Sequence, residues 1–429
     1  MANSPKIAID QEVLKSVADR IARRCDELAK HTDDAEGLTR TFCSRAMKSA
    51  HEELKTWMQA TLMDCVLDES GNLIGRYVSP KLVAGQNEPE QIFMIGSHLD
   101  TVVNAGRFDG MLGVLLGVGV VEMLHETNFR LPFQIHVVAF SEEEGVRFRF
   151  PFIGSQGVTG TLEQSTLKIA DDEGISMWQA LKDFGCEPDQ IETASYRDKK
   201  VIGFMEAHIE QAVTLEEENI PVGIVSAIAG QTRATISIEG HAGHAGTVPH
   251  NRRRDALAAA AELILQIETL GQATDGLFAT VGNVIASPGL SNVISGLAEL
   301  RLDLRHESDS ERELAFEKIQ SILNRISKSR SVTVTLDSVQ HSPAVPMDSD
   351  LAGHLESAIN DIGIEPKTMV SGAGHDAMVM STLAPSCMLF VRCKNGISHH
   401  PDEYVSPKDI RSALEVMVSA LIRRAVSKH

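Results

Sequence analysis

The stretch QIFMIGSHLDTVVNAGRFDGMLGVLLGVGVVEMLHE, residues 91–126, contains the pattern that decides the fold. It begins with an apolar run, continues through a loop rich in Gly, Val and Asn, and ends in a longer apolar segment. A short apolar run is typical of a strand buried on both faces, and the longer segment has the length of a buried helix. The stretch therefore predicts a strand, a polar loop and a helix, in that order.

The same alternation continues along the chain and predicts an α/β fold. A second apolar run, FQIHVVAFS at residues 133–141, indicates another buried strand. Buried strands separated by helices are typical of a mostly parallel sheet that helices cover on both faces. Residues 1–75 instead show the apolar spacing of helices, and a last helix is expected from about Pro407.

The middle of the chain has a different pattern. Residues 216–341 contain strands that alternate apolar and polar positions, such as TRATISIEG, and two amphipathic helices. Their order is β-α-β-β-α-β, which is the order of ferredoxin-like folds. We therefore expect a small α+β domain at 216–341, inserted into a larger domain formed by residues 1–215 and 342–429.

Composition excludes several classes of partner. The 40 Lys and Arg against 59 Asp and Glu give a net charge of −19, which repels phosphate backbones, so we expect no nucleic acid partner. The longest apolar segment, residues 111–124, is too short to cross a bilayer and carries Glu122, so we expect no membrane span. The six cysteines form no CxxC pair, and the first residues show no signal segment, so we expect free buried thiols and a cytoplasmic location.

Side chains that bind metals follow several of the predicted strands. Active sites of parallel sheets lie at the carboxyl ends of the strands. Imidazole nitrogens and carboxylate oxygens suit Zn, Mn or Co, and a carboxylate between two ions lets the pair hold both water and substrate. Asp109 is the expected bridge. A polar loop after a buried strand is the alternative interpretation. The candidates are His98, Asp109, Glu143, Glu144, His208 and His399.

Three consecutive glutamates, residues 142–144, stand before Gly145. Neighbouring glutamates on a turn can divide the work of hydrolysis, because one can bind a metal while the other takes a proton from the attacking water. A solvated acidic turn would have the same sequence, so this motif alone leaves both interpretations open.

Several motifs occur together, in one order, from about residue 20 to 425: GSHLDTV, EEEGVRF, HIEQ, GHAGHAGT, LDLRH, SGAGHDA and GISHHP. In this order the chain resembles the hydantoinase/carbamoylase family of dinuclear metal amidohydrolases, which are relatives of aminoacylase-type and carboxypeptidase-type metallopeptidases. Within that family it is most similar to bacterial allantoate amidohydrolases.

The resemblance implies two divalent ions per subunit, either Zn, Mn or Co. One ion would be held by His98, Asp109 and His208 and the other by Asp109, Glu144 and His399. Asp109 would be followed by a cis peptide bond to Gly110, and Gly106 and Gly110 would let the loop bend.

The three-glutamate run leaves the register open, and the family order of base, ligand and glycine implies that Glu143 is the general base. Asp100 would orient His98 without touching the metal, and His375 would have a similar supporting role.

The resemblance also implies which residues recognise the substrate. Arg305 would bind a substrate carboxylate through its guanidinium fork, and the inserted domain would act as a lid and pair two subunits into a homodimer. His244 would stabilise the developing oxyanion, and its position in relatives implies that it acts in the partner's site. The residues that contact the ureido end would be Gln211, His241, His244 and Asn292.

The implied activity is cleavage of a ureido C–N bond in a small anionic substrate. For allantoate the products would be ureidoglycine, ammonia and carbon dioxide. Hydrolysis of N-carbamoyl-L-amino acids is the first alternative, because RFRF and IGSQ near Arg147 are similar to that group, and ureidoglycolate hydrolysis is the next. An inactive binding protein and a peptidase are further alternatives. The complete ligand set argues against the former, and Arg305 together with HIEQ argues against the latter.

Overall fold

The computed structural model describes residues 9–78 and 91–426, and the chain divides into two compact units. The first unit consists of Met1–Ser226, Met347–Met369 and His375–His429. The second unit, Ala227–Pro346 with Val370–Gly374, interrupts the first in sequence.

The larger sheet has nine strands in the described part of the chain, in the order β1-β2-β4-β3-β5-β15-β6-β13, with β14 paired to β6. Its four central strands, β4, β3, β5 and β15, are parallel, and the strands that flank them, β2 and β6, are antiparallel to their neighbours. The predicted α/β fold is therefore confirmed, and its parallel part is the centre of the sheet. The strands are β1 (Asp64–Leu67), β2 (Leu73–Tyr77), β3 (Gln91–His98), β4 (Gln134–Phe140), β5 (Lys200–Ile209), β6 (Val222–Ile228), β13 (Val345–Pro346), β14 (Thr368–Ser371) and β15 (Ser386–Val391).

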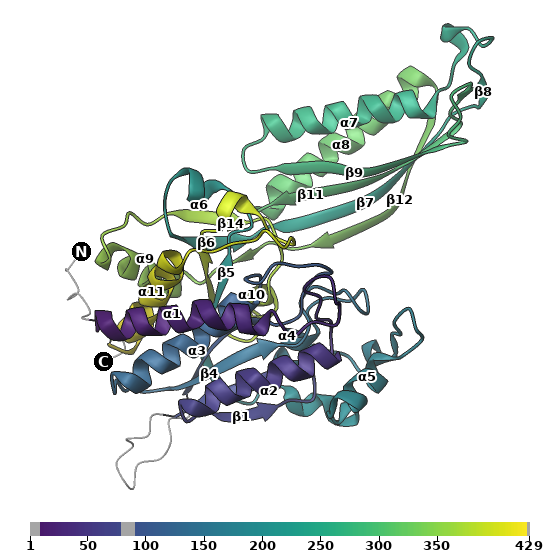
Figure 1. Ribbon diagram of the computed structural model, residues 1–429. Coiled ribbons are helices and arrows are strands. Elements are labelled where there is room, and N and C mark those ends of the chain that lie inside the picture. Colours follow the sequence, from purple (N-terminus) through teal and green to yellow (C-terminus); the bar gives the residue numbers. More distant parts are fainter. Residues whose placement is uncertain (1–8, 79–90, 427–429) are drawn as a thin grey trace. The chain divides into compact units, whose positions relative to one another are not determined.

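Helices cover both faces of this sheet. On one face α1 (Gln11–Leu28), α3 (Met111–Glu126) and α11 (Pro407–Val426) lie side by side, and α9 (Ser349–Asp361) packs against α11 (Figure 1). Helix α3 approaches β5 so closely that a Cβ on Gly113 would lie 2.1 Å from the carbonyl oxygen of Ala207. The preceding residue of β5, Glu206, points to the opposite face and accepts from the backbone N–H of Ala377 in α10 (Asp376–Met380).

The prediction that residues 1–75 are helical is correct for α1 and α2 (Arg45–Ala60) but wrong beyond them. Residues 64–77 form the β1–β2 hairpin at the edge of the sheet. The carboxylate of Asp68 accepts from the backbone N–H groups of Ser70 and Asn72, which closes the turn. Leu73 and Ile74 are buried where β2 pairs with β4, so sheet pairing outweighs the local helical pattern.

The second unit has the predicted β-α-β-β-α-β order, in an antiparallel sheet ordered β12-β7-β11-β9. The two helices cover one face of the sheet over an apolar core of their own. The other face is open. A two-stranded ribbon of β8 (Gly243–His244) and β10 (Val293–Ile294) extends this unit. Its main elements are β7 (Gly230–Glu239), α7 (Ala256–Ala273), β9 (Phe278–Ser287), β11 (Leu297–His306), α8 (Asp309–Arg330) and β12 (Thr333–Ser342).

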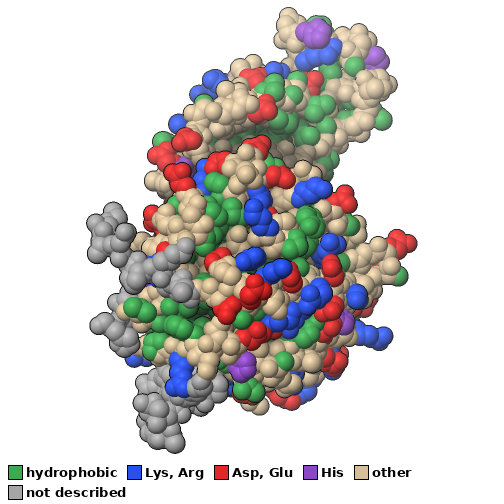
Figure 2. Space-filling view, turned by 60° about the vertical axis from the view of Figure 1, so that its left-hand side comes forward, with side chains coloured by type: hydrophobic (Ala, Val, Ile, Leu, Met, Phe, Trp, Pro, Cys, Tyr) green, Lys and Arg blue, Asp and Glu red, His purple; other side chains and the backbone are tan. Residues whose placement is uncertain are grey.

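Shorter helices complete the first unit: α4 (Ile153–Thr159), α5 (Met177–Phe184) and α6 (Thr214–Glu217). No helix within the described ranges is long and apolar enough to cross a membrane. All six cysteines are free thiols, although Cys43 and Cys65 are only half-buried rather than buried as expected. On the face shown in Figure 2, acidic and basic side chains are interspersed.

Glu122 is buried in α3 and pairs with Arg24 at 2.7 Å and Arg20 at 3.1 Å, both from α1. The Glu122→Gln variant should lose about 3 kcal/mol of unfolding free energy, because it leaves a poorly solvated guanidinium without its counter-charge. Urea denaturation followed by circular dichroism measures this loss. The control is Glu126→Gln, which removes a half-exposed partner of Arg20 and should cost less than about 1 kcal/mol. Equal losses in both variants would contradict the explanation.

Candidate metal centre

The candidate ligands lie at the carboxyl ends of the four parallel strands. His98 is the last residue of β3, and His208 is the next-to-last residue of β5. Glu144 lies in the turn after β4, and His399 lies in the loop after β15. Because parallel strands end at the same edge, the fold gathers side chains that are up to 301 residues apart in sequence.

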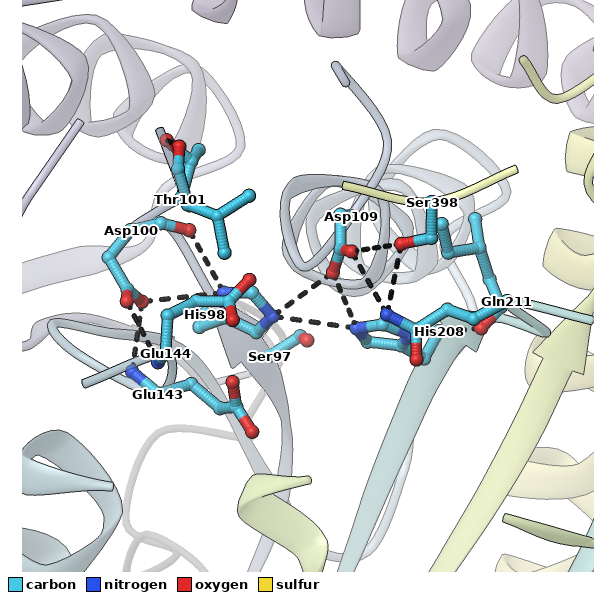
Figure 3. A network of polar contacts seen from close by, with 12 residues as sticks. Ser97, His98, Asp100, Thr101, Asp109, Glu143, Glu144, His208, Gln211 and Ser398 are labelled. Carbon is cyan, nitrogen blue, oxygen red and sulfur yellow. Dashed lines mark hydrogen bonds and ion pairs between the residues drawn. The ribbon is translucent and has the colours of Figure 1, made fainter. Parts of the chain in front are cut away.

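Asp109 is the centre of this cluster. One carboxylate oxygen, Oδ1, lies 3.1 Å from Nε2 of His208 and 3.5 Å from Nε2 of His98. The other oxygen, Oδ2, lies 3.3 Å from Nε2 of His399. Figure 3 shows the rings of His98 and His208 pointing toward each other and toward Asp109. The two oxygens of one carboxylate therefore serve two different groups of side chains.

The histidine rings are oriented so that their Nε2 atoms are acceptors. Nδ1 of His98 donates to the carbonyl oxygen of Asp100 at 3.0 Å, and Nδ1 of His208 donates to that of Ile209 at 2.9 Å. With Nδ1 as donor, a neutral ring has a lone pair on Nε2. The two Nε2 atoms are 3.4 Å apart and both face Asp109, so lone pairs converge on one point.

These separations fit a divalent metal ion. Ligand atoms at about 2.1 Å from a tetrahedral ion lie about 3.4 Å from one another. The observed separations around Asp109 Oδ1 are 3.1, 3.5 and 3.4 Å. Two groups of three possible ligands, whose atoms all lie within 4.8 Å of one another, share Asp109: His98, Asp109 and His208, and Asp109, Glu144 and His399.

The three glutamates of the turn point in different directions. Oε1 of Glu144 lies 3.4 Å from Nε2 of His399. Glu143 also lies near the cluster, because its carboxylate forms a third group of possible metal ligands with His98 and Glu144. Glu142 instead accepts from the backbone N–H of Val146 at 3.0 Å, which closes the turn. Glu142 therefore supports the turn, whereas Glu143 and Glu144 face the cluster.

Asp100 joins this turn to the first strand. Its Oδ1 accepts from the backbone N–H of Glu143 and its Oδ2 from that of Glu144, both at 3.0 Å. The same carboxylate lies 3.3 Å from Nδ1 of His98. Asp100 was expected to orient His98, and it also fixes the backbone of the glutamate turn.

The electrostatics of the cluster favour a bound cation. Burial alone would lower the pKa of His98, but Asp100 and Asp109 raise it well above the usual value. Burial raises the pKa of Glu143 well above its usual range and that of Glu144 to about 7. A cation would favour the charged form of both carboxylates. The cluster therefore gathers several carboxylates whose negative charge a bound divalent cation would offset.

Three residues around Asp109 have roles that the sequence did not indicate. Buried Glu403 accepts from the backbone N–H of Asp109 at 2.9 Å and that of Phe108 at 2.6 Å, which fixes the loop. Ser398 donates to Asp109 Oδ2 at 2.6 Å, and the amide of Gln211 donates to the same oxygen at 3.0 Å. Gln211 was expected at the substrate. Glu403 follows the GISHHP motif with Asp402 between, and that position was its only signal in the sequence.

The two loop glycines act differently from one another. Gly110 has φ +64°, which favours glycine, and a Cβ there would lie 2.5 Å from the His98 ring. Gly106 has no positive φ, and a Cβ there would lie 2.3 Å from Glu403, so it provides space rather than a bend. The expected cis bond after Asp109 is wrong, because the cis peptide of the described chain is Ser287–Pro288.

The remaining candidates belong to other parts of the structure. His375 is buried and packs against the ring of His208, with centroids 4.5 Å apart. His244 lies on β8 opposite Val293, the neighbour of Asn292, so the ribbon brings two of the expected substrate residues together. His241 precedes this ribbon, and Arg305 lies on β11. Apart from His375, all of these lie in the second unit.

Residues 94–423 match the model of Peptidase family M20/M25/M40, and the chain belongs to this family. Allantoate deiminase 1 of Glycine max is 38% identical over 92% of this chain and 87% of its own length. N-carbamoyl-L-amino acid amidohydrolase of Geobacillus stearothermophilus is 38% identical over 89% of this chain and 92% of its own length. A crystal structure of a hydantoinase/carbamoylase family amidase from Burkholderia multivorans has a TM-score of 0.88 at 28% identity, covering 98% and 99% of the two chains. The family resemblance found in the motifs is confirmed.

The Gly110→Ala variant should weaken binding of Mn²⁺ or Zn²⁺ by tenfold or more, because the new methyl group displaces His98 from Asp109. Isothermal titration of the metal-free protein measures the affinity. The matched control is Gly353→Ala on α9, where a Cβ meets no atom within 4 Å. Unchanged affinity in Gly110→Ala would show that the His98 ring does not depend on this glycine.

Proposed function

We propose that this chain is a dinuclear metal amidohydrolase that cleaves a ureido C–N bond, with allantoate as its substrate. The metal ions would be Zn, Mn or Co, which share these ligands. The observation that carries the proposal is the division of the Asp109 carboxylate between His98 and His208 on one oxygen and His399 on the other.

The side chains around the cluster supply the proton chemistry of hydrolysis. When bound, a pair of divalent ions polarises a carbonyl and lowers the pKa of water. Glu143 then takes the proton of the attacking water and delivers it to the leaving nitrogen. The bond from its backbone N–H to Asp100 holds it in position.

The second unit supplies the substrate contacts. Arg305 binds the carboxylate, while Asn292, His241 and His244 contact the ureido end, with His244 stabilising the oxyanion. The adjacency of His244 and Asn292 on the β8–β10 ribbon supports a shared role. Gln211 assists indirectly, because its amide is already bound to Asp109 and Ser398. In this proposal residues 216–341 form the lid and dimerisation domain, and residues 1–215 and 342–429 the catalytic domain.

Hydrolysis of N-carbamoyl-L-amino acids is the second candidate function. It is favoured by the Geobacillus stearothermophilus amidohydrolase, which is as similar to this chain as the Glycine max deiminase. Both kinds of substrate have a carboxylate one carbon from the ureido nitrogen. They differ in the other substituent, which is a second ureido group in allantoate and often an apolar side chain in the amino acids.

The roles of the two glutamates are separable. Glu143→Gln should retain two metal ions per chain and lose activity by about 10² or more, as expected when a general base is removed. Glu144→Gln should instead lose metal. Elemental analysis of both variants, together with ammonia release, measures the two effects. Exchange of the two phenotypes would mean that the register of the glutamate run is wrong.

Substrate preference tests the proposed activity directly. The kcat/KM for allantoate should exceed that for N-carbamoyl-L-methionine by at least about 10². The reason is that the polar groups of the pocket that bind the second ureido group would have no hydrogen-bond partner when an apolar side chain takes its place. Both are assayed on metal-reconstituted protein. A preference for the carbamoyl-amino acid would replace the first candidate function by the second, with the metal site unchanged.

We also propose a homodimer that forms through strand β9. This strand is an edge of the second unit's sheet and exposes Phe278, Val284 and Ile285, and such edges pair readily with another chain. Sedimentation velocity should give a dimer, and Ile285→Lys should give a monomer. The control Leu62→Lys changes an equally exposed residue of the first unit and should remain dimeric. A monomeric wild-type protein would disprove this assembly.

A further inference from the structure

The open face of the sheet in the second unit carries a group of charged side chains. Alternate residues of β11 point into the apolar core, among them Leu302 and Leu304, so Asp303 and Arg305 point to the opposite face. Arg233 of β7 lies directly opposite Asp303. These side chains line a hollow of about 540 Å³ together with Phe278 and Arg301.

Among the described residues that line this hollow, Asp303 is the single carboxylate, and three side chains donate hydrogen bonds to it. It accepts two bonds from Arg305, from Nε to Oδ1 at 2.9 Å and from Nη2 to Oδ2 at 3.1 Å. Oδ2 also accepts from Gln231 at 2.8 Å and from Nε of Arg233 at 3.3 Å. Burial alone would raise the pKa of Asp303, but these donors hold it below its usual value, so the carboxylate stays charged.

The bonds to Asp303 leave a defined part of Arg305 available. A guanidinium has five N–H groups. Nε and one N–H of Nη2 bind Asp303, and one N–H of Nη1 donates to the carbonyl oxygen of Gly372 at 2.6 Å. Within the described chain the other two, one on each terminal nitrogen, have no acceptor. A carboxylate can accept from one N–H on each terminal nitrogen of a guanidinium.

We propose that Asp303 is a positioning residue that holds Arg305 for the substrate carboxylate. This inference rests on the proposed function. Asp303 fixes the guanidinium in one orientation, which a flexible arginine would otherwise lose.

The test compares Asp303→Asn with Glu299→Gln. Both remove one negative charge from the same face of β11, but Glu299 lies six residues from Arg305 along the strand and shares no described hydrogen bond with it. With allantoate, Asp303→Asn should raise KM about tenfold with kcat nearly unchanged, because a carboxylate anchor binds ground state and transition state alike. Glu299→Gln should leave KM unchanged. Asp303→Glu, which restores the carboxylate, should recover part of the loss, and thermal unfolding verifies that each variant is folded.

A double-variant comparison shows whether Asp303 acts through Arg305. Arg305→Met should raise KM strongly, and adding Asp303→Asn to it should cause no further rise. A wild-type KM in Asp303→Asn, an equal rise in Glu299→Gln, or additive effects in the double variant would each overturn the inference. Those results are distinct from failure of the proposed function, because a wild-type protein that hydrolyses no ureido carboxylate would refute both proposals before any variant is compared.

Discussion

The contacts of the Asp109 carboxylate are the interactions on which the candidate metal centre of the first unit depends. Its two oxygens face His208 and His399 separately, and it also accepts from Ser398 and Gln211. A buried carboxylate with so many partners can keep one orientation only if its backbone is fixed as well. Glu403 provides this by accepting from the N–H of Asp109, and the room for Glu403 comes from the missing side chain of Gly106.

The sheet explains why so many acidic groups can lie close together. Each parallel strand brings one or two polar residues to the same edge, while the apolar remainder of the strand is buried between helices. The cost of gathering Asp100, Asp109, Glu143 and Glu144 is offset by backbone N–H donors and histidines, and a bound divalent ion would contribute the rest. The site is thus a consequence of strand order as much as of residue type.

The second unit gathers positive rather than negative side chains on one surface. Its open sheet face gathers the cations Arg233, Arg301 and Arg305, and Asp303 holds two of these guanidinium groups by direct bonds. In the first unit carboxylates in excess favour a cation, whereas here arginines in excess favour an anion.

The sequence by itself determined the α/β class, the ferredoxin-like order of the inserted segment and the identity of the ligand candidates, because apolar periodicity and motif spacing are local properties of the chain. It did not reveal the β1–β2 hairpin, whose residues are held by pairing with β4, or the roles of Glu403, Ser398 and Asp303. Those roles depend on contacts such as Glu403 to Asp109, 294 residues apart, which no local pattern encodes. Only the tertiary structure decided that Gln211 binds Asp109 and that Glu142 turns away from the cluster, since side-chain direction is fixed by the partners that folding brings within hydrogen-bonding distance.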